Sequence, residues 1–77
     1  MKKHQYIVAV DGGGTKILAA LIDSNNTITS KAKKSTDAQN GAAVVIKRII
    51  ECIETVLAQA NVKTNQLAAI VIGIPGS

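Results

Sequence analysis

Three consecutive glycines, Gly12 to Gly14, separate two apolar runs at residues 6–10 (YIVAV) and 17–23 (ILAALID). Both runs are rich in β-forming residues, and both have the length of a strand that is buried on its two faces. Glycine loses more conformational freedom on folding than any other residue, so a triplet is unfavourable inside a helix or a strand. The chain therefore has to turn here. A loosely alternating run at residues 27–33 (TITSKAK) then extends the arrangement to a three-stranded meander with an outer third strand.

The hydrophobic period changes beyond Ala42, where apolar side chains recur every three or four residues and polar side chains lie opposite them. This pattern predicts one long amphipathic helix over residues 42–60. Asp37 or Asn40 is the expected cap at its start, and Asn61 is the expected stop.

A fourth strand is predicted at residues 67–74 (LAAIVIGI), after a connecting turn at 64–66. It is apolar on both faces, as a central parallel strand would be. A strand that follows a helical crossover runs parallel to its partner, and the most economical partner is the first strand. Their carboxyl ends, at residues 11–13 and 73–76, would then meet at the edge where open sheets bind ligands. Since one helix covers only one face of such a sheet, we expect an amino-terminal piece of a longer protein, or part of an oligomer.

The glycine loop has the chemistry of an anion site. Glycines can take positive φ and turn successive N–H groups toward one point, where a phosphate fits. Thr15 adds a hydroxyl donor, and Lys16 adds a positive charge. Asp11, at the end of the first strand, is suited to hold a hydrated Mg²⁺ that bridges phosphate oxygens. A Rossmann fingerprint is excluded because Ile17 stands where a glycine is needed, and no P-loop pattern is present. A plain glycine-rich hairpin turn is the alternative.

Composition narrows the function classes. The formal charge of +4 comes with a single aromatic residue, Tyr6, so no aromatic side chains accompany the basic residues to stack on bases, and a nucleic-acid surface is disfavoured. The lysines at 31, 33 and 34 are interpreted as a solvated strand end. Cys52 is the only cysteine, which excludes an internal disulfide. No apolar run approaches the ~20 residues of a membrane span, and no signal peptide precedes the first strand, so a cytoplasmic location is expected.

Two motifs, DGGGTK at residues 11–16 and GIPG at residues 73–76, resemble the amino-terminal segment of the actin-like ATPase superfamily. Within it, the chain is most similar to the ROK family, which includes glucokinases and other hexose or N-acylhexosamine kinases. The resemblance extends over essentially the whole chain. It implies a ribonuclease-H-like fold in each of two lobes, with ATP and Mg²⁺ bound between them. Residues 1–77 would be the incomplete amino-terminal part of the nucleotide-binding lobe, with no second domain.

The resemblance also implies roles for individual residues. Asp11 would sit near the Mg²⁺, bound through water. The catalytic aspartate and the zinc-binding Cys/His cluster of the family lie further along, so no catalytic residue is expected here, and residues 1–77 alone should be inactive. A homodimer of the full-length protein is compatible with the family. The residues expected to face the nucleotide phosphates are Gly12, Gly13, Gly14, Thr15 and Lys16, and those toward the sugar are Pro75, Gly76 and Ser77.

The expected function is therefore ATP-dependent phosphorylation of a sugar hydroxyl. A triple glycine also occurs in the N-acetylglucosamine kinase and BadF/BadG-type ATPase branch, whereas Pro75 favours ROK. A ROK-type sugar-responsive transcriptional regulator is disfavoured, because only ten residues precede Asp11 and leave no room for a DNA-binding segment. A third alternative is an ATPase that couples hydrolysis to conformational change. The sequence does not identify the sugar.

Overall fold

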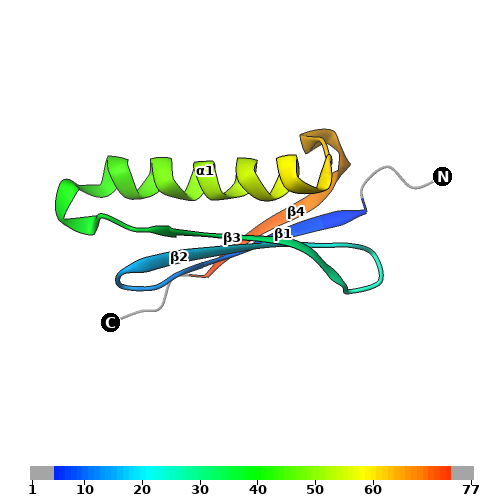
Figure 1. The fold of residues 1–77 in the computed structure, drawn as a ribbon, viewed down its shortest axis with the longest axis horizontal. Coiled ribbons are helices and arrows are strands. Elements are labelled where there is room, and N and C mark those ends of the chain that lie inside the picture. The colour runs from blue at the N-terminus through cyan, green and yellow to red at the C-terminus, as the bar shows by residue number, and fades with distance from the viewer. Residues whose placement is uncertain (1–4, 74–77) are drawn as a thin grey trace.

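The computed structural model describes residues 5–73, which form a four-stranded mixed sheet with one long helix packed on one face (Figure 1). The order of strands and helix is β-β-β-α-β, as predicted. The elements are β1 (Tyr6–Gly12), β2 (Lys16–Ile22), β3 (Ile28–Ser35), the 3-10 turn η1 (Ala38–Asn40), α1 (Ala42–Ala60), the 3-10 turn η2 (Thr64–Gln66) and β4 (Leu67–Gly73).

The strands lie in the order β3-β2-β1-β4. Antiparallel pairing of β1 with β2, and of β2 with β3, confirms the predicted meander with β3 at its outer edge. β4 pairs with β1 in parallel, and Asp11 stands opposite Gly73 in the register. Figure 1 shows that β1 and β4 end on the same side of the molecule, where the β1–β2 hairpin also lies. The predicted meeting of the two carboxyl ends is thus confirmed for the described residues.

The core lies between α1 and the sheet, because alternate side chains of β1 and β2 point toward the helix. Complete burial of a valine, leucine or isoleucine side chain contributes about 1.5–3 kcal/mol. This burial, rather than helix or strand propensity, holds the layers together. The buried apolar residues are Val8, Val10, Ile17, Ala19, Leu21, Cys52, Val56, Leu57 and Val62.

The sequence predicted the carboxyl-terminal end of α1 correctly but not its amino-terminal cap. Asn61 has the left-handed conformation (φ 55°) and its N–H donates to the carbonyl of Leu57, so it stops the helix as predicted. The amino-terminal cap is Gly41, at φ 102°, and the prediction of Asp37 or Asn40 was wrong. Asn40 belongs to η1, and the carboxylate of Asp37 is bound elsewhere.

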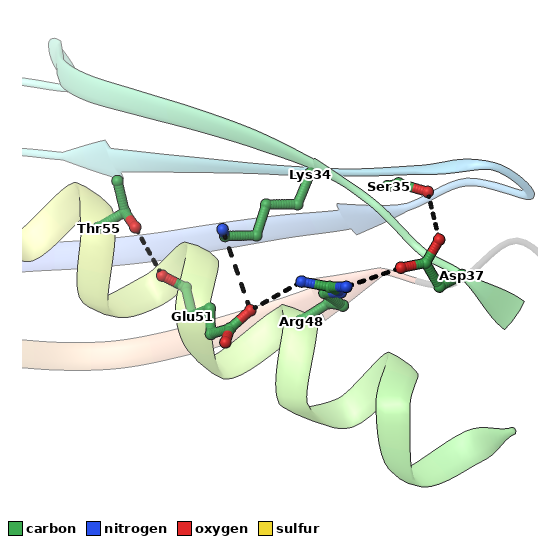
Figure 2. Close-up of polar contacts among 6 residues, drawn as sticks. All are labelled: Lys34, Ser35, Asp37, Arg48, Glu51 and Thr55. Atoms are coloured by element: carbon green, nitrogen blue, oxygen red, sulfur yellow. Dashed lines mark hydrogen bonds and ion pairs between the residues drawn. The ribbon is translucent and has the colours of Figure 1, made fainter. Parts of the chain in front are cut away.

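Asp37 joins the end of β3 to α1 through a polar network (Figure 2). Its Oδ1 accepts a hydrogen bond from Ser35 Oγ at 3.0 Å, and its Oδ2 pairs with Arg48 Nη2 at 2.8 Å. Arg48 Nη1 lies 3.4 Å from Glu51 Oε1, which is also 4.0 Å from Lys34 Nζ. The Ser35 hydrogen bond and the Arg48 guanidinium hold the pKa of the Asp37 carboxyl below its ordinary value. The network therefore favours ionised Asp37 and fixes where β3 leaves the sheet.

The sequence predicted β4 as a central strand, and this was wrong. β4 lies at the edge of the sheet. α1 packs mainly over β2 and β3. Leu67, at the start of β4, packs against the core, but the rest of the strand is exposed. Ile70, Val71 and Ile72 are each about half exposed, so the described residues leave most of this apolar strand uncovered.

Candidate functional site

The glycines form a tight hairpin between β1 and β2. The N–H of Gly13 donates to the carbonyl of Lys16 at 2.8 Å, so Gly14 and Thr15 make the tip. None of the three glycines has positive φ, so the loop does not use this freedom of glycine. Glycine is nevertheless favoured at position 13, where a Cβ would make a tight contact of 3.3 Å with the Lys16 carbonyl oxygen. At Gly14 a Cβ would meet no atom within 4 Å, so packing inside the described chain does not require a glycine there.

The hairpin tip is anchored from one side by Thr36. The Thr36 hydroxyl donates to the carbonyl of Gly14 at 3.1 Å, and the Thr36 N–H donates to the carbonyl of Thr15 at 3.0 Å. Within residues 5–73, no hydrogen bond engages the N–H groups of Gly14 or Thr15. The tip therefore uses its acceptors internally and leaves two donors available, as an anion site requires. The sequence analysis missed Thr36, whose only signal was its place after a predicted strand.

A hollow of about 320 Å³ lies beside the hairpin. The structure thus brings together most of the residues predicted to face phosphate, together with Asp11. Gly12 is part of β1 and does not line the hollow. Pro75, Gly76 and Ser77 lie outside the described residues, so their predicted place toward the sugar stays a prediction. The lining residues are Asp11, Gly13, Gly14, Thr15, Lys16, Leu18 and Lys33.

Lys33 is a member of this site that the sequence analysis assigned to a solvated strand end. It is exposed, and it is the register partner of Leu18, which is in turn the partner of Asp11. These three side chains form one row across the face of the sheet that α1 leaves open. Two lysines, Lys16 and Lys33, therefore accompany the single carboxylate of Asp11, and the balance of charge in the hollow favours an anion.

A larger groove of about 730 Å³ continues from the hollow along the same open face. The two share Asp11, Leu18 and Lys33. Its floor is formed mostly by small and aliphatic side chains, and Val71 and Gly73 of β4 complete its far side. A polar, cationic end and an apolar extension suit a ligand that carries a phosphate at one end and a less polar group at the other.

Asp11 provides a single exposed carboxylate at the end of β1. Residues 5–73 contain no group of three or more His, Cys, Asp or Glu side chains that could hold a metal ion between them. A cation held by protein ligands alone does not fit. A hydrated Mg²⁺ does fit, because Mg²⁺ keeps several waters and commonly uses one or two carboxylates together with substrate phosphates.

Comparisons with known proteins bear on the family and the fold of the chain. The model of the ROK family matches residues 7–77, and no curated protein matches the chain at a significant level. Among solved structures, a protein assigned as an N-acetylglucosamine kinase from Chromobacterium violaceum is 25% identical with a TM-score of 0.70. A reductive activator for a corrinoid, iron-sulfur protein is 14% identical with a TM-score of 0.83, a likeness of fold alone.

Each match covers 96% of this chain, and the chain spans 27% of the first structure and 15% of the second. The likeness confirms the predicted fold class, a ribonuclease-H-like β-β-β-α-β half-domain with a mixed sheet, as in the actin-like ATPases. In the part of the chain that the structure describes, no helix has the length and apolar character needed to cross a membrane.

Proposed function

Since the chain belongs to the ROK family, as its two motifs indicated, we propose that it forms the phosphate-binding part of an ATP-dependent sugar kinase. The observation that carries this proposal is the hollow at the β1–β2 hairpin. It is lined by two lysines, Asp11, and the tip residues Gly14 and Thr15, whose N–H groups make no hydrogen bond within residues 5–73. A structural turn alone needs none of these groups. Phosphoryl transfer needs all of them, because it depends on positioning and on stabilising negative charge.

In this proposal the hairpin tip binds the phosphates of ATP. The N–H groups of Gly14 and Thr15 donate to phosphate oxygens, and the Thr15 hydroxyl adds a third donor. Lys16 and Lys33, which line the hollow together with Asp11, neutralise part of the phosphate charge. Gly14 lacks a side chain so that phosphate can approach the backbone, which gives a reason for the glycine that packing does not supply.

The proposed cofactor is Mg²⁺, which Asp11 would hold through water. Bound there, the ion would neutralise charge on the phosphate oxygens during transfer. Asp11 would orient the hydrated ion, and its negative carboxylate would repel direct contact with the phosphates. These are the tasks of this chain's residues, and the base that activates the sugar hydroxyl is predicted to lie further along the protein.

The sugar is proposed to bind beyond the carboxyl end of β4. Gly73 lies opposite Asp11, so the residues that follow β4 start next to the phosphate hollow. Residues 75–77 are proposed to face the sugar on this ground and on the motif they share with the family. We propose a hexose or an N-acylhexosamine, and the similarity to an N-acetylglucosamine kinase makes N-acetylglucosamine the first of these to test.

The second candidate is an ATPase that couples hydrolysis to a conformational change. The fold it shares with a reductive activator is the observation that supports it. The same hollow would bind ATP in both cases, so the two functions differ in the acceptor, which is a sugar hydroxyl in one and water in the other.

The experiment is a panel assay on the intact protein with ATP and Mg²⁺, in which sugar phosphate and free phosphate are both measured. The proposal expects phosphorylation of glucose, N-acetylglucosamine or a related hexose, and loss of at least about 100-fold in rate for Asp11→Asn. Release of free phosphate with no turnover of any sugar would contradict the kinase and support the ATPase. Asp23→Asn is the control, because Asp23 Oδ1 caps the distant β2–β3 turn through the N–H groups of Asn25 and Thr27.

A further inference from the structure

Thr36 is the one buried polar side chain among the described residues, with 5% of its surface exposed. A buried hydroxyl is unfavourable unless it is hydrogen-bonded. Here the hydroxyl and the N–H of the same residue both donate to the tip of the glycine hairpin, which lies more than twenty residues earlier in the chain. The strand end that carries Thr36 is thus bound to the hairpin by two hydrogen bonds of ordinary length.

One of these two bonds sets the direction of a proposed phosphate donor. A trans peptide is planar, and its N–H points opposite to its C=O. The carbonyl of Gly14 shares a peptide plane with the N–H of Thr15, so holding that carbonyl against Thr36 turns the Thr15 N–H to the other side. The Thr15 carbonyl, which accepts from the Thr36 N–H, fixes the next peptide plane, which carries the N–H of Lys16. The hairpin contains glycines that could otherwise rotate freely, and Thr36 removes that freedom at the tip.

Thr36 is itself held in place by the residues on either side of it. Ser35 and Asp37 hydrogen-bond to each other across it at 3.0 Å, and Asp37 is bound to Arg48 of α1 (Figure 2). Asp37 also has a left-handed backbone, at φ 50°, which ends the extended conformation of β3 directly after Thr36. A chain of contacts therefore runs from the helix through Asp37 and Thr36 to the glycine tip.

We propose that Thr36 is a positioning residue that holds the tip of the glycine hairpin in the conformation in which the Thr15 N–H faces the phosphates of ATP. The proposal rests on the proposed function and adds to it a residue outside the recognised motif. Thr36 does not touch ATP. It acts on the orientation of the peptides at Gly14 and Thr15, and so on the affinity for nucleotide.

The test compares three variants of the intact protein. Thr36→Val keeps the shape of the side chain and removes the hydroxyl, and Thr36→Ser restores the hydroxyl. Thr29→Val is the matched control, because Thr29 Oγ1 also donates to a strand carbonyl at 3.1 Å, that of Leu21, at the opposite end of the sheet. Two quantities are measured below the melting temperature of every variant: the Kd for Mg-ATP, and the rate of amide hydrogen exchange at residues 13–16 without nucleotide.

We expect Thr36→Val to weaken Mg-ATP binding about tenfold and to speed exchange at the hairpin by a similar factor. Thr36→Ser should restore both within about twofold, and Thr29→Val should change neither. Equal Kd and equal exchange in Thr36→Val and Thr29→Val would overturn the positioning role. The other failure is a wild-type protein that binds no nucleotide, while Thr36→Val still speeds exchange at the hairpin. That result would overturn the proposed function instead, so the two failures are distinguishable.

Discussion

Asp11 of β1 and Gly73 of β4 are direct partners in a parallel register. Neighbouring strands are about 4.8 Å apart, so the chain leaves the sheet twice at nearly the same point. It leaves β1 into the glycine hairpin, and β4 ends at Gly73. Two residues some sixty positions apart in the sequence thereby lie side by side at the edge of the sheet where open α/β sheets bind their ligands.

Gly14→Ala distinguishes a phosphate loop from a plain turn. The backbone at Gly14 is not left-handed, and an added Cβ would meet open space. We expect the free energy of unfolding to stay the same or rise by about 0.4–1 kcal/mol, since alanine reduces the freedom of the unfolded chain. Binding of Mg-ATP, measured by calorimetry, should weaken about tenfold, which corresponds to ~1.4 kcal/mol, because the methyl group occupies the path of the phosphate.

The control for this variant is Gly41→Ala. Gly41 has φ 102° and ψ 166°, a conformation close to glycine-only, so alanine should destabilise the fold by about 1–3 kcal/mol. Its effect on ATP binding should be negligible in the folded protein. Unchanged ATP affinity in Gly14→Ala would mean that the glycine serves only the turn.

Lys33→Met tests whether Lys33 belongs to the phosphate site. The hollow at the hairpin is lined by Lys33 and not by Lys31, although both lysines lie on β3 and line the larger groove. We expect Lys33→Met to raise the KM for ATP about fivefold, or ~1 kcal/mol for an exposed charge, and Lys31→Met to leave it unchanged. The wild-type KM should also rise with added salt more steeply than that of Lys33→Met. Similar effects of both substitutions would point to the general charge of the sheet face.

Asp37→Asn is expected to lower the melting temperature at pH 7, because it removes the ion pair with Arg48. The folded protein lowers the pKa of Asp37 below the ordinary 3.8, so its contribution to stability is present above that pH. It is lost as the pH falls through the lowered pKa of the folded state, where the wild-type carboxylate becomes protonated. The gap between the two melting temperatures should therefore be constant from pH 5 to 7 and narrow as the pH falls below 3.8.

The same gap should shrink in 1 M salt, since Asp37 and Arg48 are both partly exposed to solvent and salt screens exposed charges. A gap that stays constant down to pH 2 would show that the contribution does not depend on the charge of Asp37. Melting curves followed by circular dichroism are sufficient for both measurements.

Val71→Lys is expected to reduce self-association of a polypeptide of residues 1–77 expressed alone. β4 is an apolar strand at the edge of the sheet, and an edge of this kind offers unpaired backbone groups to other chains. Ile46→Lys is the matched control, because Ile46 is as exposed as Val71, at 57% against 55%, but lies on a helix. Light scattering should show less association for Val71→Lys only. Equal improvement in both would mean that general hydrophobicity, not the strand edge, drives association.

Much of the fold followed from local patterns. The period of 3.6 over residues 42–60 predicted α1 with the same bounds that the structure shows, and Asn61 ended it as expected. The glycine triplet predicted the β1–β2 hairpin. These features were predictable because hydrophobic period and turn chemistry act between residues close in the sequence. The motif at residues 11–16 also indicated the family correctly.

Other features depended on which segments meet, and no local pattern encodes that. The position of β4 was misjudged because an apolar strand has the same pattern at an edge as in the centre, and only the sheet order shows the difference. The cap of α1 was misjudged because Asp37 binds Arg48, a partner eleven residues away. Thr36 has no signal in the sequence beyond its place after a predicted strand, because its importance comes from the hairpin that the meander folds against it. The sequence by itself determined the secondary-structure elements and the residues of the proposed phosphate site, and the tertiary structure decided which other residues hold those residues in place, since long-range contacts form only when the layers pack.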